Sequence, residues 1–238
     1  MLAGVRNEED APAGTEAALL DVTNGDHVQA LAHLEALDGL VNNAGIALAA
    51  PLEFLPLDEL RRQLEVNVIG QVAVTQAVLP ALRSSGGRVV FVGSIAGRSA
   101  LPFLSAYAAS KHALEAISDS LRIELAPWGI HVTIVEPGTI LTRIWTRSAE
   151  RADALAARMG PRAPELYGER MAAFRRVAAK RGASGASADA VATVVARALA
   201  SARPRTRYLV GRDARLRAGV ERLPDRLRDR VYERVLLR

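Results

Sequence analysis

The chain has 238 residues, half of them hydrophobic, and a formal net charge of +5. This size suits one α/β domain with its own core, and the hydrophobic content excludes a disordered chain. The absence of cysteine excludes disulfides, thiol nucleophiles and thiolate metal sites. No apolar run approaches the roughly 20 residues that span a bilayer, and the N-terminus does not resemble a signal peptide, so we expect a cytoplasmic protein without a membrane span.

Short apolar runs alternate with longer periodic stretches along the chain. The expected strands are residues 17–22, 39–43, 88–93, 131–136 and 207–211. The expected helices are residues 26–37, 57–84, 105–128 and 188–202. Strand and helix in regular alternation predict an α/β fold, a Rossmann-type doubly wound parallel sheet with right-handed crossovers.

Two stretches depart from this alternation within what we interpret as a single domain, residues 1–238. Residues 139–186 are rich in helix formers but contain breaks, which predicts an insertion that forms a lid over the substrate. Residues 212–238 predict an amphipathic C-terminal helix, interrupted at Pro224.

Residues 203–238 carry twelve arginines against five acidic residues. We favour a solvated, ion-paired helix for this basic segment, while peripheral contact with an anionic membrane stays open. It offers no aromatic ladder for bases, so no nucleic-acid partner is expected. The four histidines show no metal-ligand spacing, so we expect no metal.

The segment from Tyr107 to Lys111 carries the chemistry. Positions i and i+4 share a helix face, so the phenol and the ammonium are expected side by side. A nearby cation lowers the pKa of a phenol, which otherwise lies near ~10, and so fits it for proton exchange with a carbonyl or alcohol oxygen. Lys111 is one of only two lysines among 31 cationic residues, which suggests that arginine cannot replace it.

Polar residues follow the neighbouring strands. Ser94 follows the strand 88–93, Asn43 ends the strand 39–43, and Pro137 follows the strand 131–136. The carboxyl ends of parallel strands meet at one sheet edge, where ligands bind in open α/β folds. Asn67 stands among apolar helix neighbours, which indicates a buried, hydrogen-bonded amide.

In chain order these features resemble the short-chain dehydrogenase/reductase family. The resemblance covers roughly residues 4–211 and rests on Asp21-Val22-Thr23, Asn42 to Gly45, Asn67, Ser94, Tyr107 with Lys111, and Pro137-Gly138 with Thr142.

The resemblance implies roles for these residues. Tyr107 is the catalytic acid and base, Ser94 orients the substrate oxygen, and Lys111 lowers the pKa of Tyr107 and binds the nicotinamide ribose. Asn67 holds a water that links Lys111 to solvent. The residues implied to contact the cofactor are Arg6, Asp21, Val22, Asn43, Ala44, Gly45, Tyr107, Lys111, Pro137, Gly138, Ile140 and Thr142.

Arg6 bears on the choice of cofactor. It lies where the resemblance places the end of the family's second strand, and an arginine there favours the 2′-phosphate of NADP. NAD remains the alternative.

The family's first strand and its Gly-x-x-x-Gly-x-Gly turn, which binds the pyrophosphate, are not found in the sequence. We therefore expect an N-terminally truncated Rossmann domain. A start codon assigned too late is the explanation we favour, and true truncation and loss of catalysis are the alternatives.

The resemblance implies an NADP-dependent oxidoreductase that interconverts an alcohol and a ketone or aldehyde, acts on a small-molecule substrate of hydrophobic character, and assembles as a homodimer or homotetramer. The alternative is a non-catalytic binding or scaffold protein on the same fold, because fold alone does not establish function.

Overall fold

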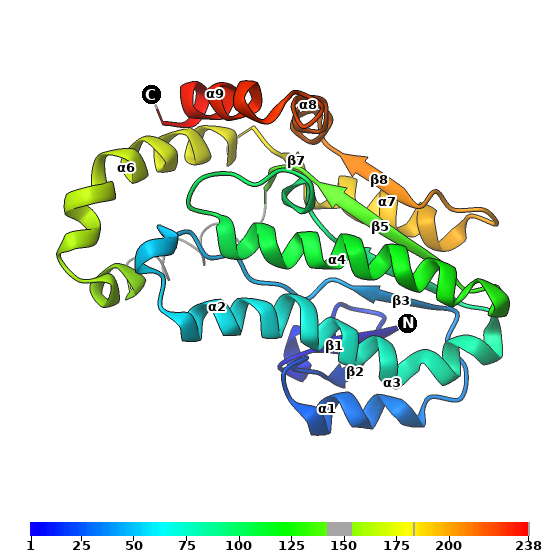
Figure 1. The fold of residues 1–238 in the computed structure, drawn as a ribbon. Coiled ribbons are helices and arrows are strands. Elements are labelled where there is room, and N and C mark those ends of the chain that lie inside the picture. The colour runs from blue at the N-terminus through cyan, green and yellow to red at the C-terminus, as the bar shows by residue number, and fades with distance from the viewer. Residues whose placement is uncertain (142–153, 183, 238) are drawn as a thin grey trace.

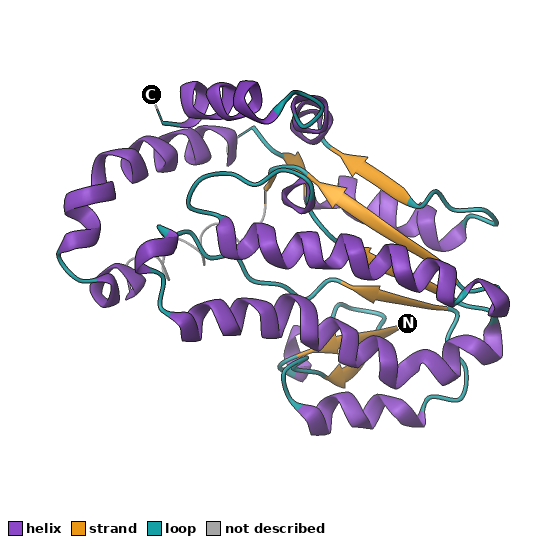
Figure 2. Cartoon of the chain, in the orientation of Figure 1, coloured by secondary structure: helices purple, strands orange, loops and turns teal. Residues whose placement is uncertain are grey.

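The computed structural model describes residues 1–141, 154–182 and 184–237. Its strands are β1 (Leu2–Val5), β2 (Glu16–Leu19), β3 (Gly39–Asn42), β4 (Arg88–Val92), β5 (His131–Pro137), β6 (Ile140–Leu141), β7 (Ala186–Ser187) and β8 (Arg207–Val210). Its α-helices are α1 (Gly25–Ala30), α2 (Leu57–Leu64), α3 (Gly70–Ser85), α4 (Ser105–Glu124), α6 (Arg162–Gly182), α7 (Ala188–Ala200), α8 (Arg212–Val220) and α9 (Asp225–Leu236). Figures 1 and 2 show helices around parallel strands, as the sequence predicted.

The parallel strands are divided between two main sheets. Strands β3, β4, β5 and β8 pair in that order, whereas β1 pairs with β2 in a separate two-stranded sheet. Among the described residues no strand pairs with β1 on its other side, and a pocket lined by Leu2 of β1 and Val41 of β3 lies between the two sheets. The expected single sheet is therefore interrupted at this point.

Alternating residues of β4 explain why helices cover both faces of the larger sheet. Val89 and Phe91 enter a core cluster with Leu114 of α4, while Val90 enters a second cluster with Ala198 of α7. Successive side chains of a strand point to opposite faces, so α4 and α7 pack on opposite sides (Figure 1). Strands buried on both faces are nearly continuous apolar runs, as the sequence of β4 shows.

The long helix expected at residues 57–84 is divided into α2 and α3 by a π-helical turn, η4 (Glu65–Ile69). The stretch Leu57–Ser85 has the length and hydropathy of a membrane-crossing helix, yet in this fold it is a core helix, because Val74, Val78 and Leu82 enter the main core cluster. The helix expected at residues 26–37 is shorter: α1 ends at Ala30, and a single 3-10 turn, η2 (Leu31–His33), follows it.

The C-terminal segment folds back over the carboxyl edge of the larger sheet. It forms two helices, α8 and α9, which are separated by the break expected at Pro224. Tyr232 and Leu236 of α9 are buried in a cluster with Phe174 of α6 and Leu104. The basic segment is thus part of the packed structure, and α6 and α9 lie side by side above the sheet edge (Figure 1).

Candidate active site

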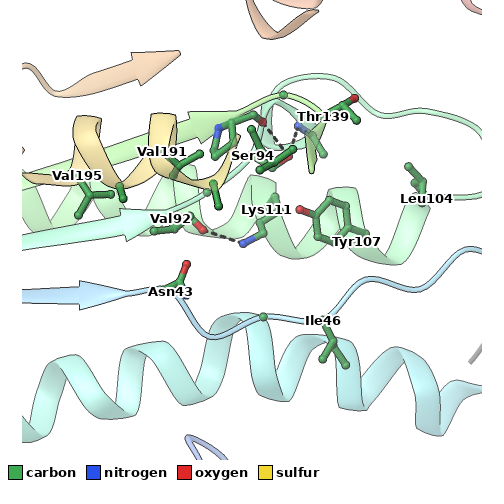
Figure 3. A pocket seen from close by; sticks show the side chains of 18 of the residues that line it. Asn43, Ile46, Val92, Ser94, Leu104, Tyr107, Lys111, Thr139, Val191 and Val195 are labelled. Carbon is green, nitrogen blue, oxygen red and sulfur yellow. Dashed lines mark hydrogen bonds between the residues drawn. The ribbon is translucent and has the colours of Figure 1, made fainter. Parts of the chain in front are cut away.

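A pocket of about 800 Å³ lies at the carboxyl ends of β3, β4 and β5. The edge of a parallel sheet is where backbone groups and following loops converge, so a ligand site is expected there. Of the residues predicted from the sequence, those that line it are Asn43, Gly45, Ser94, Tyr107, Lys111, Pro137, Gly138 and Ile140. Figure 3 shows Ser94, Tyr107 and Lys111 together in this pocket.

Helix α4 brings Tyr107 and Lys111 to the same pocket, as their four-residue spacing predicts. The Lys111 Nζ atom donates a hydrogen bond to the carbonyl oxygen of Val92, at 2.9 Å, and lies 5.8 Å from the centroid of the Tyr107 ring. Burial lowers the pKa of Lys111 to about 8. The ammonium therefore points toward the end of β4 rather than directly at the phenol hydroxyl (Figure 3).

The pKa of the Tyr107 phenol is shifted in the direction opposite to the expected one. Burial raises the pKa of this phenol, and the hydrogen bond with Ser94 and the charge of Arg217 offset the rise only in part. Lys111 was expected to lower this pKa; in the structure Arg217 is the cation that acts on the phenol. Tyr107 is consequently protonated at neutral pH, the form that can donate a proton.

Ser94 is fixed directly after β4. It caps the 3-10 turn η5 (Ile95–Gly97), where its Oγ accepts a hydrogen bond from the Ala96 amide at 3.1 Å. The side chain is 7% exposed and also reaches the carbonyl oxygen of Pro137, at 3.5 Å. The strand end and the cap together place this hydroxyl beside Tyr107.

Asn67 lies in the π-helical turn η4 and is fully buried. Its Oδ1 accepts a hydrogen bond from the Ile46 amide at 2.8 Å, and its Nδ2 donates to the Ile46 carbonyl oxygen at 2.9 Å and to Ser110 Oγ at 3.0 Å. The predicted buried, bonded amide is confirmed. Its partners fix the loop after β3 to α4, so the side chain orients the pocket wall.

The other predicted cofactor contacts lie away from these side chains. Ala44 accepts a hydrogen bond from Gln71 through its carbonyl oxygen, at 2.6 Å, and Val22 packs against the start of α3 at Gly70. Asp21 binds Thr23 at the end of β2, and a hydrogen bond from the Thr23 hydroxyl lowers the pKa of its carboxyl. Arg6 is exposed at the end of β1. None of these four residues lines the described pocket, and Thr142 lies outside the described residues.

Two pocket residues of the C-terminal helices, Arg217 and Leu236, were not predicted. Arg181 comes from α6 and Arg217 from α8, and both line the pocket with Leu104, Phe174 and Leu236. Leu104 lies in the segment 94–104, and Phe174 and Arg181 lie in the stretch 139–186; the sequence predicted that these two segments build the substrate pocket. The C-terminal segment was expected to be solvated, because the contact of α8 with the loop after β4 is distant in the chain.

The pocket fits one end of a nicotinamide nucleotide. Lys111 has three N–H groups and, within the part of the chain that the structure describes, a single hydrogen bond, so it can donate to vicinal ribose hydroxyls. Gly45 lies beside it, since a Cβ atom added there would be 3.9 Å from Lys111 Nζ, an ordinary van der Waals distance. The wall from β1 contributes Leu2 and Ala3, whose side chains are apolar. Among the described residues no group of three potential metal ligands occurs.

Comparison with known proteins identifies the family. The family model of the short chain dehydrogenases matches residues 9–153. The chain is 35% identical to the NADPH-dependent 3-dehydrocapnine reductase of Ornithobacterium rhinotracheale, over 83% of this chain and 70% of that protein. It is 37% identical to retinol dehydrogenase 5 of Mus musculus, over 97% of this chain and 77% of that protein. The chain spans about half the length of some other relatives.

Solved structures give the same result. A short chain dehydrogenase from Burkholderia cenocepacia, in complex with NADP, superimposes with a TM-score of 0.74 at 26% identity, over 99% of this chain and 85% of that one. The chain belongs to the short-chain dehydrogenase/reductase family of NAD(P)-dependent oxidoreductases.

Proposed function

We propose that this protein interconverts a secondary or primary alcohol and the corresponding ketone or aldehyde, with NADP as the hydride carrier. The observation that supports this proposal most is the presence of Ser94, Tyr107 and Lys111 in one pocket at the carboxyl edge of the sheet. Such a pocket joins a proton donor, a hydrogen-bonding hydroxyl and a cation around one small volume.

In the direction of reduction, Tyr107 donates its proton to the carbonyl oxygen as that oxygen gains negative charge. The raised pKa of the phenol keeps this proton in place at neutral pH. Ser94 donates a hydrogen bond to the same oxygen and holds it within reach of Tyr107. A bound nicotinamide would supply the hydride, and in alcohol oxidation it would accept one.

Lys111 acts in this proposal as the ribose ligand and as a local positive charge. Its ammonium is buried, and its spare N–H groups suit two adjacent hydroxyls. Asn67 keeps the loop from Gly45 to Ile46 in place above it through the hydrogen bonds to Ile46. Both residues thereby orient the cofactor ribose relative to Tyr107.

Three observations support NADP over NAD. Arg6 at the end of β1 suits a 2′-phosphate, one relative is named as NADPH-dependent, and one structural neighbour contains NADP. The family resemblance also suggests a homodimer or homotetramer formed through α3 and α4, which sedimentation velocity would reveal as a mass of two or four chains.

A titration with NADPH, followed by a screen of ketones and aldehydes for NADPH oxidation, tests the proposal. Tyr107→Phe should lower kcat/KM by about 10²–10⁴-fold, the usual contribution of a positioned acid. Tyr208→Phe is the matched control, because that tyrosine lies on β8 outside the pocket and should keep full activity.

A non-catalytic binding or scaffold protein on the same fold is the second candidate, because fold alone does not establish function. Millimolar NADPH that neither binds nor is oxidised with any carbonyl compound would support this candidate and contradict the oxidoreductase.

A further inference from the structure

Arg217 is a mostly buried cation that forms no ion pair with a carboxylate in the described part of the chain. Its Nε donates to Ser99 Oγ at 3.2 Å, and its Nη2 donates to the Ser99 carbonyl oxygen at 2.8 Å and to Ser99 Oγ at 3.1 Å. Within the described part of the chain, no carboxylate lies within ion-pair distance of it, and Nη1 makes no hydrogen bond. By contrast, the guanidinium groups of Arg98 and Arg207 each contact Glu136.

A hydrogen-bond chain fixes the position of this guanidinium. Tyr232 donates its hydroxyl proton to Glu221, at 2.6 Å, so the Ser99 hydroxyl must donate to Tyr232, at 2.7 Å. The lone pairs of Ser99 Oγ then remain for Arg217. The negative charge of Glu221 is therefore two groups away, and it also faces Arg228 at 3.5 Å.

The pocket that Arg217 lines is positive. Among its described lining residues are Lys111, Arg181 and Arg217 but no aspartate or glutamate. Arg181 lies near enough for its charge to lower the pKa of Arg217 further, beyond the effect of burial. Tyr232 and, to a smaller extent, Asp213 act in the opposite direction and raise this pKa. The Asp213 carboxylate accepts a hydrogen bond from the Thr139 amide at 2.6 Å, and Asp213 does not line the pocket.

Apolar side chains form the walls around these cations. They are Leu101, Leu104, Phe174, Val177, Ala178 and Leu236. A buried cation with no partner is unfavourable, and an anion that enters the pocket removes this cost. A guanidinium fork also matches the two oxygens of a carboxylate.

We propose that Arg217, with Arg181 beside it, binds a carboxylate on the substrate, and that the substrate is an amphiphilic carbonyl or alcohol compound whose apolar part lies against Leu104 and Phe174. This inference rests on the proposed function for the reacting carbonyl. The anion site itself is independent of hydride transfer and can be tested alone. The 2′-phosphate or pyrophosphate of the cofactor is the competing anion.

Binding of decanoate and of its neutral methyl ester, measured by calorimetry without cofactor, tests the anion site. The native protein should bind decanoate at least tenfold more tightly. Arg217→Met should abolish this preference, and Arg217→Lys should retain part of it. Arg215→Met is the matched control, since Arg215 is exposed on the same helix. Equal affinity for acid and ester in the native protein, or an unchanged preference in Arg217→Met, would overturn the proposal.

Folding of Arg217→Met is checked by its circular dichroism spectrum. If that variant does not fold, Arg181→Met replaces it and should lower the preference for decanoate, and an unchanged preference there would overturn the proposal.

Measurements of activity and of NADPH affinity distinguish a substrate carboxylate from a cofactor phosphate as the anion that Arg217 binds. With 4-oxodecanoate and its methyl ester, Arg217→Met should raise KM for the acid at least tenfold more than KM for the ester, and leave the NADPH affinity unchanged. A tenfold loss of NADPH affinity with an unchanged KM for the acid would assign Arg217 to the cofactor and overturn the proposal. Selective decanoate binding by a protein that oxidises no NADPH would refute the proposed function and leave the anion site standing.

Discussion

Tyr107 and Lys111 occupy one helix face, and burial shifts both of them toward their neutral forms. The pKa of the phenol is raised, and that of the ammonium is lowered to about 8. Near pH 7 the phenol therefore keeps its proton while Lys111 is still charged. This combination suits proton donation to a carbonyl oxygen beside a cation.

The lowered pKa of Lys111 predicts the alkaline limb of the activity. As the pH rises through about 8 the ammonium loses its charge, so kcat/KM for carbonyl reduction should fall above that pH. Initial rates between pH 6 and pH 10 measure this limb. Lys111→Met should lower kcat/KM at least tenfold at pH 7 and remove the limb near pH 8. A native profile that stays flat to pH 10 would contradict the assignment.

Spacing along one helix was enough to predict that Tyr107 and Lys111 share a pocket, because i and i+4 positions are fixed by local geometry. The same reasoning could not find Arg217. Its contact with Ser99 joins residues 118 positions apart, and it exists only because α8 folds back onto the loop after β4. Sequence patterns are informative for local geometry and silent on such a tertiary contact.

At the scale of elements, the π-helical turn η4 is the clearest local departure from the predicted helix. An extra residue in the turn rotates Asn67 toward the loop after β3, where it satisfies both backbone groups of Ile46. The apolar periodicity of residues 57–84 continues through the turn, so the pattern predicted one helix. Only the isolated asparagine among apolar neighbours indicated something unusual.

Asn67→Ala should lower the free energy of unfolding by about 1–3 kcal/mol, because it leaves the part-buried Ile46 N–H group without its partner, while the Ile46 carbonyl oxygen keeps its hydrogen bond from Gln63. Urea unfolding followed by circular dichroism measures the change. Gln76→Ala, at an exposed position of α3, is the control and should have little effect. Equal stability of the native protein and Asn67→Ala would show that water replaces the amide.

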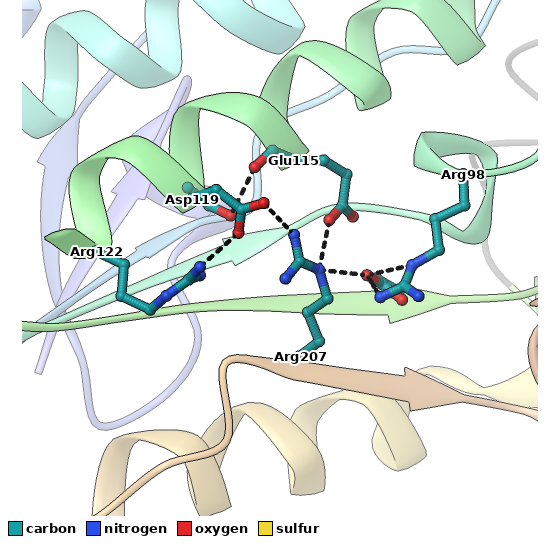
Figure 4. Close-up of polar contacts among 7 residues, drawn as sticks. Arg98, Glu115, Asp119, Arg122 and Arg207 are labelled. Atoms are coloured by element: carbon teal, nitrogen blue, oxygen red, sulfur yellow. Dashed lines mark hydrogen bonds and ion pairs between the residues drawn. The ribbon is translucent and has the colours of Figure 1, made fainter.

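A partly buried charge cluster joins α4, β5 and β8. Arg207 contacts Glu115 at 2.9 Å and Asp119 at 2.6 Å, while Glu136, fully buried, accepts from Arg98 at 2.7 Å (Figure 4). Glu115 Oε1 and Glu136 Oε2 have no hydrogen-bond partner among the described residues. Burial, and then the neighbouring charge of Glu136, raises the pKa of Glu115 to about 7.

This raised pKa predicts how stability depends on pH. The folded protein keeps the Glu115 proton up to about pH 7, whereas the unfolded chain releases it near the ordinary value of 4.5. The free energy of unfolding should therefore decrease between pH 4.5 and pH 7 through this group, by up to about 1.4 kcal/mol per pH unit. In Glu115→Gln this contribution should vanish. Urea unfolding at several pH values measures this contribution, and Glu124→Gln, at an exposed position, is the control. Identical pH dependence of the free energy of unfolding in Glu115→Gln and the native protein would refute the raised pKa of Glu115.

At the scale of the whole molecule, the two main sheets differ in how deeply they are buried. Every residue of β5 except His131 is buried, whereas no residue of β1 or β2 is. The segment directly after β2 joins the smaller sheet to the rest, because Leu20 and Val22 pack against the core cluster that contains Val28 of α1 and Val74 of α3. The alternation of strands and helices predicted the layers correctly, but the break between β1 and β3 depends on which strands meet in space.

The amides of β1 and β2 should therefore exchange with solvent through an opening of lower free energy than those of β4 and β5, as native-state hydrogen exchange would measure.

Gly70 allows close packing of α3 against the segment after β2, because a Cβ atom there would lie 2.7 Å from the carbonyl oxygen of Val22. Gly70→Ala gains about 1 kcal/mol of helix propensity, but the clash with backbone should outweigh it and speed exchange in β1 and β2 alone. Gly219→Ala is the matched control, since nothing lies within 4 Å of its added methyl group, and it should stabilise the protein. Uniform exchange across both sheets would show that they open as one cooperative unit.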